Sequence, residues 1–116
     1  MGADVRDVKV GDRVSTIPSF SMRQYGVYGE SAVVPAFAAV PYPDTLSAEE
    51  AAAIWMPYMT AYGALIALGK LQPEQTVLIT AASSSVGLAA IQIVKSAGAL
   101  AVATTRGPDK KNFLLE

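Results

Sequence analysis

The residues best suited to bind a ligand lie at 81–87, in the segment Ala-Ala-Ser-Ser-Ser-Val-Gly. A short apolar run with β-branched residues at 76–81 predicts a strand before it, and residues 86–97 predict a helix that ends at Gly98. The start of a helix offers unpaired backbone N–H groups and a partial positive charge, which together attract a phosphate. Small side chains let such a group come close to the backbone. The segment therefore predicts a phosphate-binding turn.

The glycine pattern of this turn is incomplete. The fingerprint of dinucleotide-binding turns would place glycines at positions 82, 84 and 87, and only Gly87 is present, with Ala82 and Ser84 at the other two. Serine suits position 84 if its φ is negative, and its hydroxyl could donate to a phosphate. The motif alone favours another interpretation, in which Ser84 is only an N-cap and Gly87 only packs the helix against the strand. A strand before it and a helix after it favour the binding interpretation.

A second apolar strand is predicted at 100–105, and it ends in Thr104, Thr105 and Arg106. An acidic residue here, about 20 residues after the turn, would hydrogen-bond the ribose of NAD. Neutral and basic residues stand there instead, followed by Lys110, and cationic side chains suit the 2′-phosphate of NADP. The alternative is that both cations are ordinary solvated residues. Asp109 is a competing ribose acceptor, although its place favours a cap of the last helix, predicted at 110–116.

Strand, helix and strand in this order predict a parallel βαβ unit with a right-handed crossover. Continuous apolar strands are typical of a sheet covered on both faces, but a lone βαβ unit leaves sheet edges and one apolar face exposed. The fold class is therefore α/β.

The residues before this unit form two segments that differ in their predicted secondary structure. Residues 1–40 have β character, with strands at 8–10, 13–15 and 31–34. Residues 45–69 predict helix, with a capping box formed by Ser47 and Glu50, a buried segment at 51–56, a break at Pro57 and a second piece at 59–68 that ends at Gly69.

Composition narrows the function classes. The 116 residues are 52% hydrophobic and 16% charged, which excludes a disordered chain. A net charge of −1 argues against a general nucleic-acid binder. The absence of cysteine and histidine excludes disulfides and the commonest zinc ligands. Residues 51–69 carry no charge, but Pro57 and Thr60 argue against a membrane span, and the charged start is no signal peptide, so we expect a cytoplasmic protein.

The succession of motifs resembles the medium-chain dehydrogenase/reductase superfamily, in its quinone oxidoreductase-like branch. No single motif is decisive, but their order and spacing hold over nearly the whole chain. The matching stretches are residues 8–14 (Val-Lys-Val-Gly-Asp-Arg-Val), 28–35, 46–53 (Leu-Ser-Ala-Glu-Glu-Ala-Ala-Ala), 59–65 (Met-Thr-Ala-Tyr-Gly-Ala-Leu) and 76–92.

The resemblance implies a division into parts. Residues 1–42 would be the end of a GroES-like β-rich catalytic domain, residues 43–75 connecting helices, and residues 76–116 the first βαβ of a truncated, NADP-binding Rossmann domain. Because the family's members are longer, we expect the chain to be a fragment. We further expect it to show no turnover in isolation.

Family roles carry over at matching positions. Ser84, Ser85, Val86 and Gly87 would form the pyrophosphate-binding turn, Thr60 would lie near the nicotinamide, and Thr105, Arg106 and Lys110 would surround the adenosine ribose. Met56 stands where zinc-dependent relatives place a cysteine, so no metal site is predicted. Catalytic residues remain unassigned, since Tyr62 matches a packing position.

The function implied is transfer of hydride from NADPH to a quinone, an enone or a related carbonyl acceptor, by a zinc-independent oxidoreductase. We expect a small-molecule substrate, no nucleic acid or membrane partner, and a homo-oligomer. Two alternatives stay open: a non-catalytic truncated or oligomerising domain, and a zinc-dependent alcohol dehydrogenase whose ligands lie outside this chain.

Overall fold

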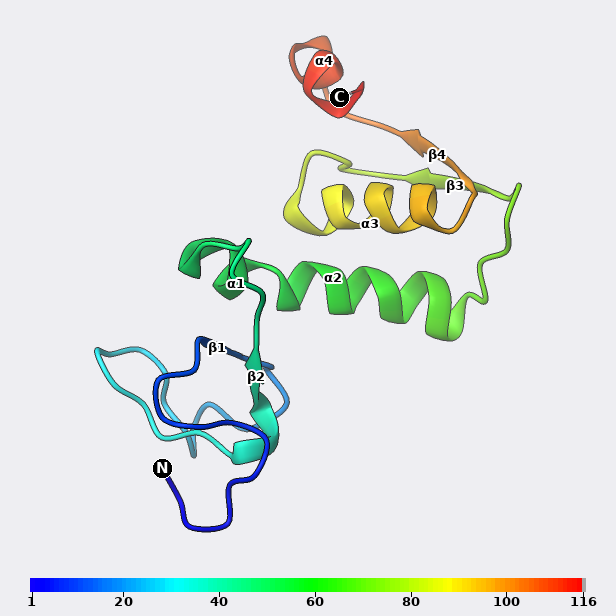
Figure 1. The fold of residues 1–116 in the computed structure, drawn as a ribbon. Coiled ribbons are helices and arrows are strands. Elements are labelled where there is room, and N and C mark those ends of the chain that lie inside the picture. The colour runs from blue at the N-terminus through cyan, green and yellow to red at the C-terminus, as the bar shows by residue number, and fades with distance from the viewer. Residues whose placement is uncertain (116) are drawn as a thin grey trace. The chain divides into compact units, whose positions relative to one another are not determined.

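The structure is a computed structural model that describes residues 1–115 (Figure 1). The chain divides into two compact units, Met1–Trp55 and Met56–Glu116. Among the described residues, no helix is both long and apolar enough to cross a bilayer.

The first unit is built on a two-stranded antiparallel sheet. Strand β1 (Val14–Thr16) pairs with β2 (Ala39–Pro41), which follows the short 3-10 helix η1 (Ala36–Ala38). The prediction of strands at 8–10 and 31–34 is wrong, because neither segment is a strand in the structure. At the first, the N–H of Lys9 bonds to the Asp12 carboxylate at 2.9 Å, which closes a turn instead of a strand pair.

The side chains of Arg13 and Trp55 make contacts that hold this unit together. The guanidinium of Arg13 lies 4.7 Å from the centroid of the Tyr42 ring and donates to the Leu46 carbonyl at 2.8 Å. The indole N–H of Trp55 donates to the hydroxyl of Ser15 at 2.8 Å, and this serine is buried. These contacts tie β1 and the residue before it to the chain before and after helix α1 (Ala48–Ala53).

Helix α1 has the predicted capping box. Ser47 accepts from the N–H of Glu50 at 3.2 Å, and the Glu50 carboxylate accepts from the N–H of Ser47 at 2.8 Å. The prediction that residues 51–56 are buried is wrong except at Ala51, since a helix of six residues buries only one side.

The predicted helix break falls one turn before Pro57. Helix α2 (Trp55–Tyr62) begins after a bend at Ile54, and Pro57 lies in its first turn. Proline has no N–H to offer the carbonyl four residues earlier, at Ala53, where α1 ends. A π-helical segment η2 (Gly63–Leu68) continues α2 and ends at Gly69, as predicted.

The second unit contains the predicted parallel βαβ. Strand β3 (Thr76–Ile79) pairs with β4 (Leu100–Ala103), and helix α3 (Ser85–Ser96) connects them. Gly98, with a φ of +72°, ends the turn after α3. The 3-10 helix η3 (Pro108–Lys110) and helix α4 (Lys111–Leu115) follow β4.

Helix α3 covers one face of this sheet and contacts η2 on its other side (Figure 1). The core between these layers consists of small and β-branched residues: Ala61, Ile79, Ala82, Ala89, Ala90 and Val94. On the opposite sheet face Leu78 and Leu100 are 65% and 60% exposed. The prediction of a bare apolar face is confirmed for the described residues.

Candidate functional site: a cavity at the start of helix α3

A cavity of about 810 Å³ lies at the carboxyl ends of β3 and β4. Because the two strands are parallel, the segments that leave them meet at one edge of the sheet. The segments before α3 and after β4 line the cavity with Ala81, Ser83, Ser84, Thr104, Thr105, Arg106, Gly107, Asp109 and Lys110.

Backbone hydrogen bonds fix the turn that leaves β3. The N–H of Ala82 donates to the carbonyl of Thr104 at 3.0 Å, and the N–H of Thr104 donates to the carbonyl of Ile79 at 2.9 Å. Ala81, the residue before Ala82, has a φ of +49°, a left-handed conformation that is uncommon for alanine. The turn and the end of β4 are therefore held side by side.

Ser84 is the N-cap residue of α3. Its backbone has φ −77° and ψ 162°, so the negative φ on which serine at this position depends is present. Its hydroxyl oxygen accepts from the N–H of Gly87 at 3.1 Å, which leaves the hydroxyl proton available to a ligand. The N–H groups of Ser85 and Val86 have no acceptor within the helix, because the first turn of any α-helix lacks one.

Gly87 is required by a close backbone approach. A β-carbon at this position would lie 2.6 Å from the carbonyl oxygen of Ala82 and 2.7 Å from its carbonyl carbon. Real β-carbons do not come so near to backbone atoms, and Ala82 is completely buried. The glycine therefore lets α3 pack directly on the turn that leaves β3.

The charged side chains of the cavity are all exposed. Arg106 and Lys110 supply two cations, and neither forms a salt bridge with another described residue. Asp109 is the cavity's acidic residue. The prediction that it caps the last helix is wrong, because it lies inside η3, whose N-cap residue is Gly107.

The structure brings half of the predicted site residues into the cavity lining: Ser84, Thr105, Arg106 and Lys110. Ser85, Val86 and Gly87 form the first turn of α3 beside it. Thr60 is not among the lining residues. It lies in α2, where its hydroxyl donates to the carbonyl of Met56 at 2.6 Å. Ala81, Ser83 and Thr104 also line the cavity, and they lie in the segments that the sequence had singled out. Sequence reasoning missed Gly107, although its place directly after Arg106 could have indicated it.

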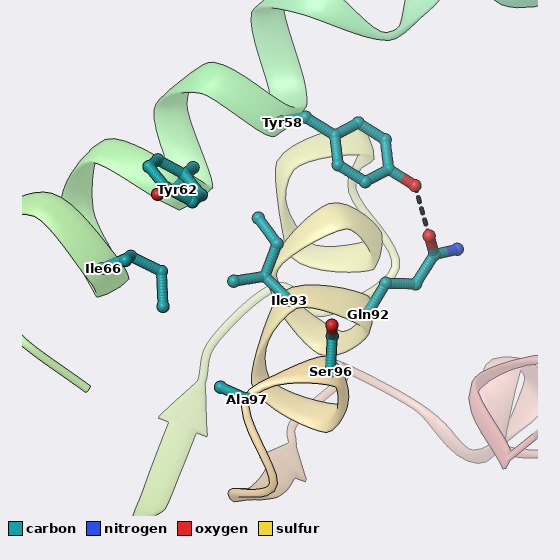
Figure 2. A pocket seen from close by; sticks show the side chains of 7 residues that line it. All are labelled: Tyr58, Tyr62, Ile66, Gln92, Ile93, Ser96 and Ala97. Atoms are coloured by element: carbon teal, nitrogen blue, oxygen red, sulfur yellow. Dashed lines mark hydrogen bonds between the residues drawn. The ribbon is translucent and has the colours of Figure 1, made fainter. Parts of the chain in front are cut away.

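A second depression of about 500 Å³ lies between α2–η2 and α3 (Figure 2). Tyr58, Tyr62 and Ile66 line one side, and Gln92, Ile93, Ser96 and Ala97 the other. The Tyr58 hydroxyl donates to the side-chain oxygen of Gln92 (Figure 2). Tyr62 belongs to this depression and does not line the cavity at the strand ends.

Comparison with known proteins places these features in a family, although no family model matches the chain. A highly reducing polyketide synthase, ZEA2 of Gibberella zeae, is 39% identical over 115 residues, which is 99% of this chain and 5% of that protein. The chain thus spans a small part of this relative.

Two solved structures are similar in both sequence and fold. The CurK enoyl reductase is 42% identical with a TM-score of 0.64, over 67% of this chain and 23% of that one. The quinone oxidoreductase of Thermus thermophilus, solved also in complex with NADPH, is 39% identical with a TM-score of 0.64, over 69% and 26%. Together with the α/β fold and its parallel βαβ unit, these similarities show that the chain belongs to the medium-chain dehydrogenase/reductase superfamily, in its quinone oxidoreductase-like branch.

Proposed function

We propose that this chain forms part of the coenzyme-binding region of an NADPH-dependent oxidoreductase. The enzyme reduces a quinone, an enone or a related carbonyl compound. The observation that carries the proposal is the cavity at the carboxyl ends of β3 and β4, where the start of α3 and two cationic side chains meet. The enoyl reductase and quinone oxidoreductase relatives support the reaction class.

The residues of the cavity fit the anionic groups of this coenzyme. Ser84 and the free amides of Ser85 and Val86 would bind the pyrophosphate, because N–H donors and the helix dipole both favour negative charge. A phosphate monoester carries a charge of about −1.5 to −2 at neutral pH. Arg106 and Lys110 match that charge, and we therefore assign the 2′-phosphate to them.

The remaining predicted residues have subordinate roles in this proposal. Thr105 would lie against the adenosine ribose, since it lines the same cavity. Gly87 would act indirectly, by letting α3 approach the turn. Thr60 is assigned near the nicotinamide on the family resemblance alone. We also retain the division into residues 1–42, 43–75 and 76–116 as a proposal about the domains.

When bound, NADPH supplies a hydride to an electron-poor carbon of the acceptor. A proton completes the reduction, so an enone becomes a saturated ketone and a quinone becomes a hydroquinone. The protein contributes orientation, exclusion of water and stabilisation of the developing oxyanion. Within this chain, the residues at the cavity hold and orient the adenosine half of the coenzyme.

Coenzyme titration tests the proposal. We expect NADPH to bind this chain at least about tenfold more tightly than NADH, because one charge-assisted contact is worth about 1.4 kcal/mol or more. Isothermal titration calorimetry at low ionic strength would measure both dissociation constants. Equal affinity for the two coenzymes, or binding of neither, would contradict the proposal.

Substitution of Ser84 by Asp separates its capping role from its binding role. Aspartate caps helices as well as serine does, so the free energy of unfolding should stay within about 0.5 kcal/mol of that of the parent. The added negative charge should weaken NADPH binding at least about tenfold by repelling the pyrophosphate. Urea unfolding and calorimetry would measure the two effects.

Ser47 offers a matched control, because it is the N-cap residue of α1 and lies in the other unit. Ser47→Asp should leave both stability and NADPH affinity nearly unchanged. If Ser84→Asp binds NADPH as tightly as Ser47→Asp does, Ser84 is only a cap and the pyrophosphate assignment is wrong.

A further inference from the structure

We propose that Asp109 is a specificity-determining residue of the coenzyme cavity, which favours a free ribose 2′-hydroxyl and opposes a 2′-phosphate. This inference rests on the proposed function, because it concerns how the same cavity discriminates between phosphorylated and unphosphorylated adenosine. It predicts that the preference for NADPH is weaker than the two cations alone would produce.

The Asp109 carboxylate belongs to the wall of the cavity. Asp109 lines the cavity together with Arg106 and Lys110, and it lies between them in the chain. Its side chain turns back toward Gly107, since a β-carbon on that glycine would lie 3.8 Å from Oδ2 of Asp109. The carboxylate therefore shares the wall of the cavity with both cations.

The Asp109 carboxylate also has no hydrogen-bonding or charged partner among the described residues. Among the described residues, the Asp109 carboxylate accepts no hydrogen bond and forms no salt bridge. Its charge is therefore not neutralised by Arg106 or Lys110 in this arrangement. The cavity presents two positive charges and one negative charge to a ligand.

The chemistry of the ligand decides which of these charges matters. An ionised carboxylate is an acceptor only, so it can pair with the donor hydroxyls of a ribose. It repels a phosphate dianion at the same place. In a solvent-exposed site, each such interaction between charges a few ångströms apart changes affinity by a factor of about five.

Replacement of Asp109 by Asn tests the inference on the whole 116-residue chain. Asparagine keeps the size and a hydrogen-bonding oxygen but removes the charge. The probes are adenosine 2′,5′-bisphosphate and adenosine 5′-monophosphate, which differ only in the 2′-phosphate. Calorimetry should show that Asp109→Asn binds the bisphosphate about fivefold more tightly and the monophosphate no more tightly than the parent does.

Glu74→Gln is the matched control. Glu74 is exposed and lies in the segment before β3, at the opposite end of the strand from the cavity. This substitution removes the same charge from the same unit, so it should leave both affinities unchanged. An equal gain in the two variants would mean that only net charge matters and would overturn the inference.

The outcomes also separate this inference from the proposed function. If the parent prefers the bisphosphate but Asp109→Asn has the same preference or a smaller one, the role of Asp109 is wrong and the coenzyme cavity stands. If the parent binds neither probe, both the cavity assignment and the role of Asp109 are overturned.

Discussion

Replacement of both Arg106 and Lys110 by Ala is expected to weaken NADPH binding about 50-fold and to change NADH binding by less than about threefold. Both side chains are exposed in the same cavity wall and are free of salt bridges to other described residues. Hydrogen bonds to charged groups contribute about 1.5–3 kcal/mol each, and solvent exposure reduces that value to about 1.2 kcal/mol. The two cations together then contribute about 2.4 kcal/mol, which corresponds to about 50-fold in affinity. NADH has no 2′-phosphate, so it does not depend on these cations.

Lys95→Ala supplies the control for this double variant. Lys95 is a cation of the same unit, but it lies in the last turn of α3, away from the helix start that borders the cavity. It should leave both affinities unchanged. Calorimetry at two salt concentrations would add a second reading, because the parent's preference for NADPH should decrease as salt screens the charges. Equal losses of NADPH and NADH in the double variant would contradict the assignment of the 2′-phosphate.

Substitution of Gly87 by Ala is expected to destabilise the second unit by about 3 kcal/mol, a large effect for a single methyl group. The new β-carbon would meet the backbone of Ala82 at 2.6 Å, and a buried backbone cannot move aside as a flexible side chain can. Urea unfolding followed by circular dichroism would measure the loss. NADPH binding should fall as well, because α3 must shift away from the turn that forms the cavity.

Gly63→Ala is the matched control for this variant. Gly63 begins η2, and a β-carbon there would have no neighbour within 4 Å. Alanine at such a helical position should stabilise the unit by about 0.5–1 kcal/mol, since glycine is the poorer helix former. If Gly87→Ala were as stable as Gly63→Ala, the close packing of α3 on the turn would be disproved.

Local sequence patterns predicted the βαβ unit well. Its strands are short apolar runs on either side of α3, and Ser84, Gly87 and Gly98 mark the ends of that helix by residue type. The capping box of Ser47 and Glu50 is equally local. In each case the signal and the structure it specifies lie within a few residues of one another.

The strands of the first unit could not be predicted in this way. β1 and β2 are three residues each, and they pair across a long loop, so their partner is fixed by contacts that no local pattern reveals. Val33 is 81% exposed although its neighbours look like a strand. A run of four residues, Ser-Ala-Val-Val at 31–34, was too short to identify pairing.

The candidate site was predictable in part for a physical reason. The carboxyl ends of parallel strands meet at one edge, so residues after β3 and β4 had to meet there. The place of Asp109 inside η3, and its lack of a partner in the described residues, depend on how the chain turns after Gly107. Residue types alone do not specify that turn.

The most direct test of the account is to map where the nucleotide binds. We expect that adding adenosine 2′,5′-bisphosphate to the ¹⁵N-labelled chain shifts the backbone amide signals of Ser85, Val86, Thr105 and Arg106 most strongly. These amides surround the cavity at the start of α3. Shifts confined to the depression around Tyr58, Gln92 and Ile93 (Figure 2), or no shifts at millimolar ligand, would contradict it.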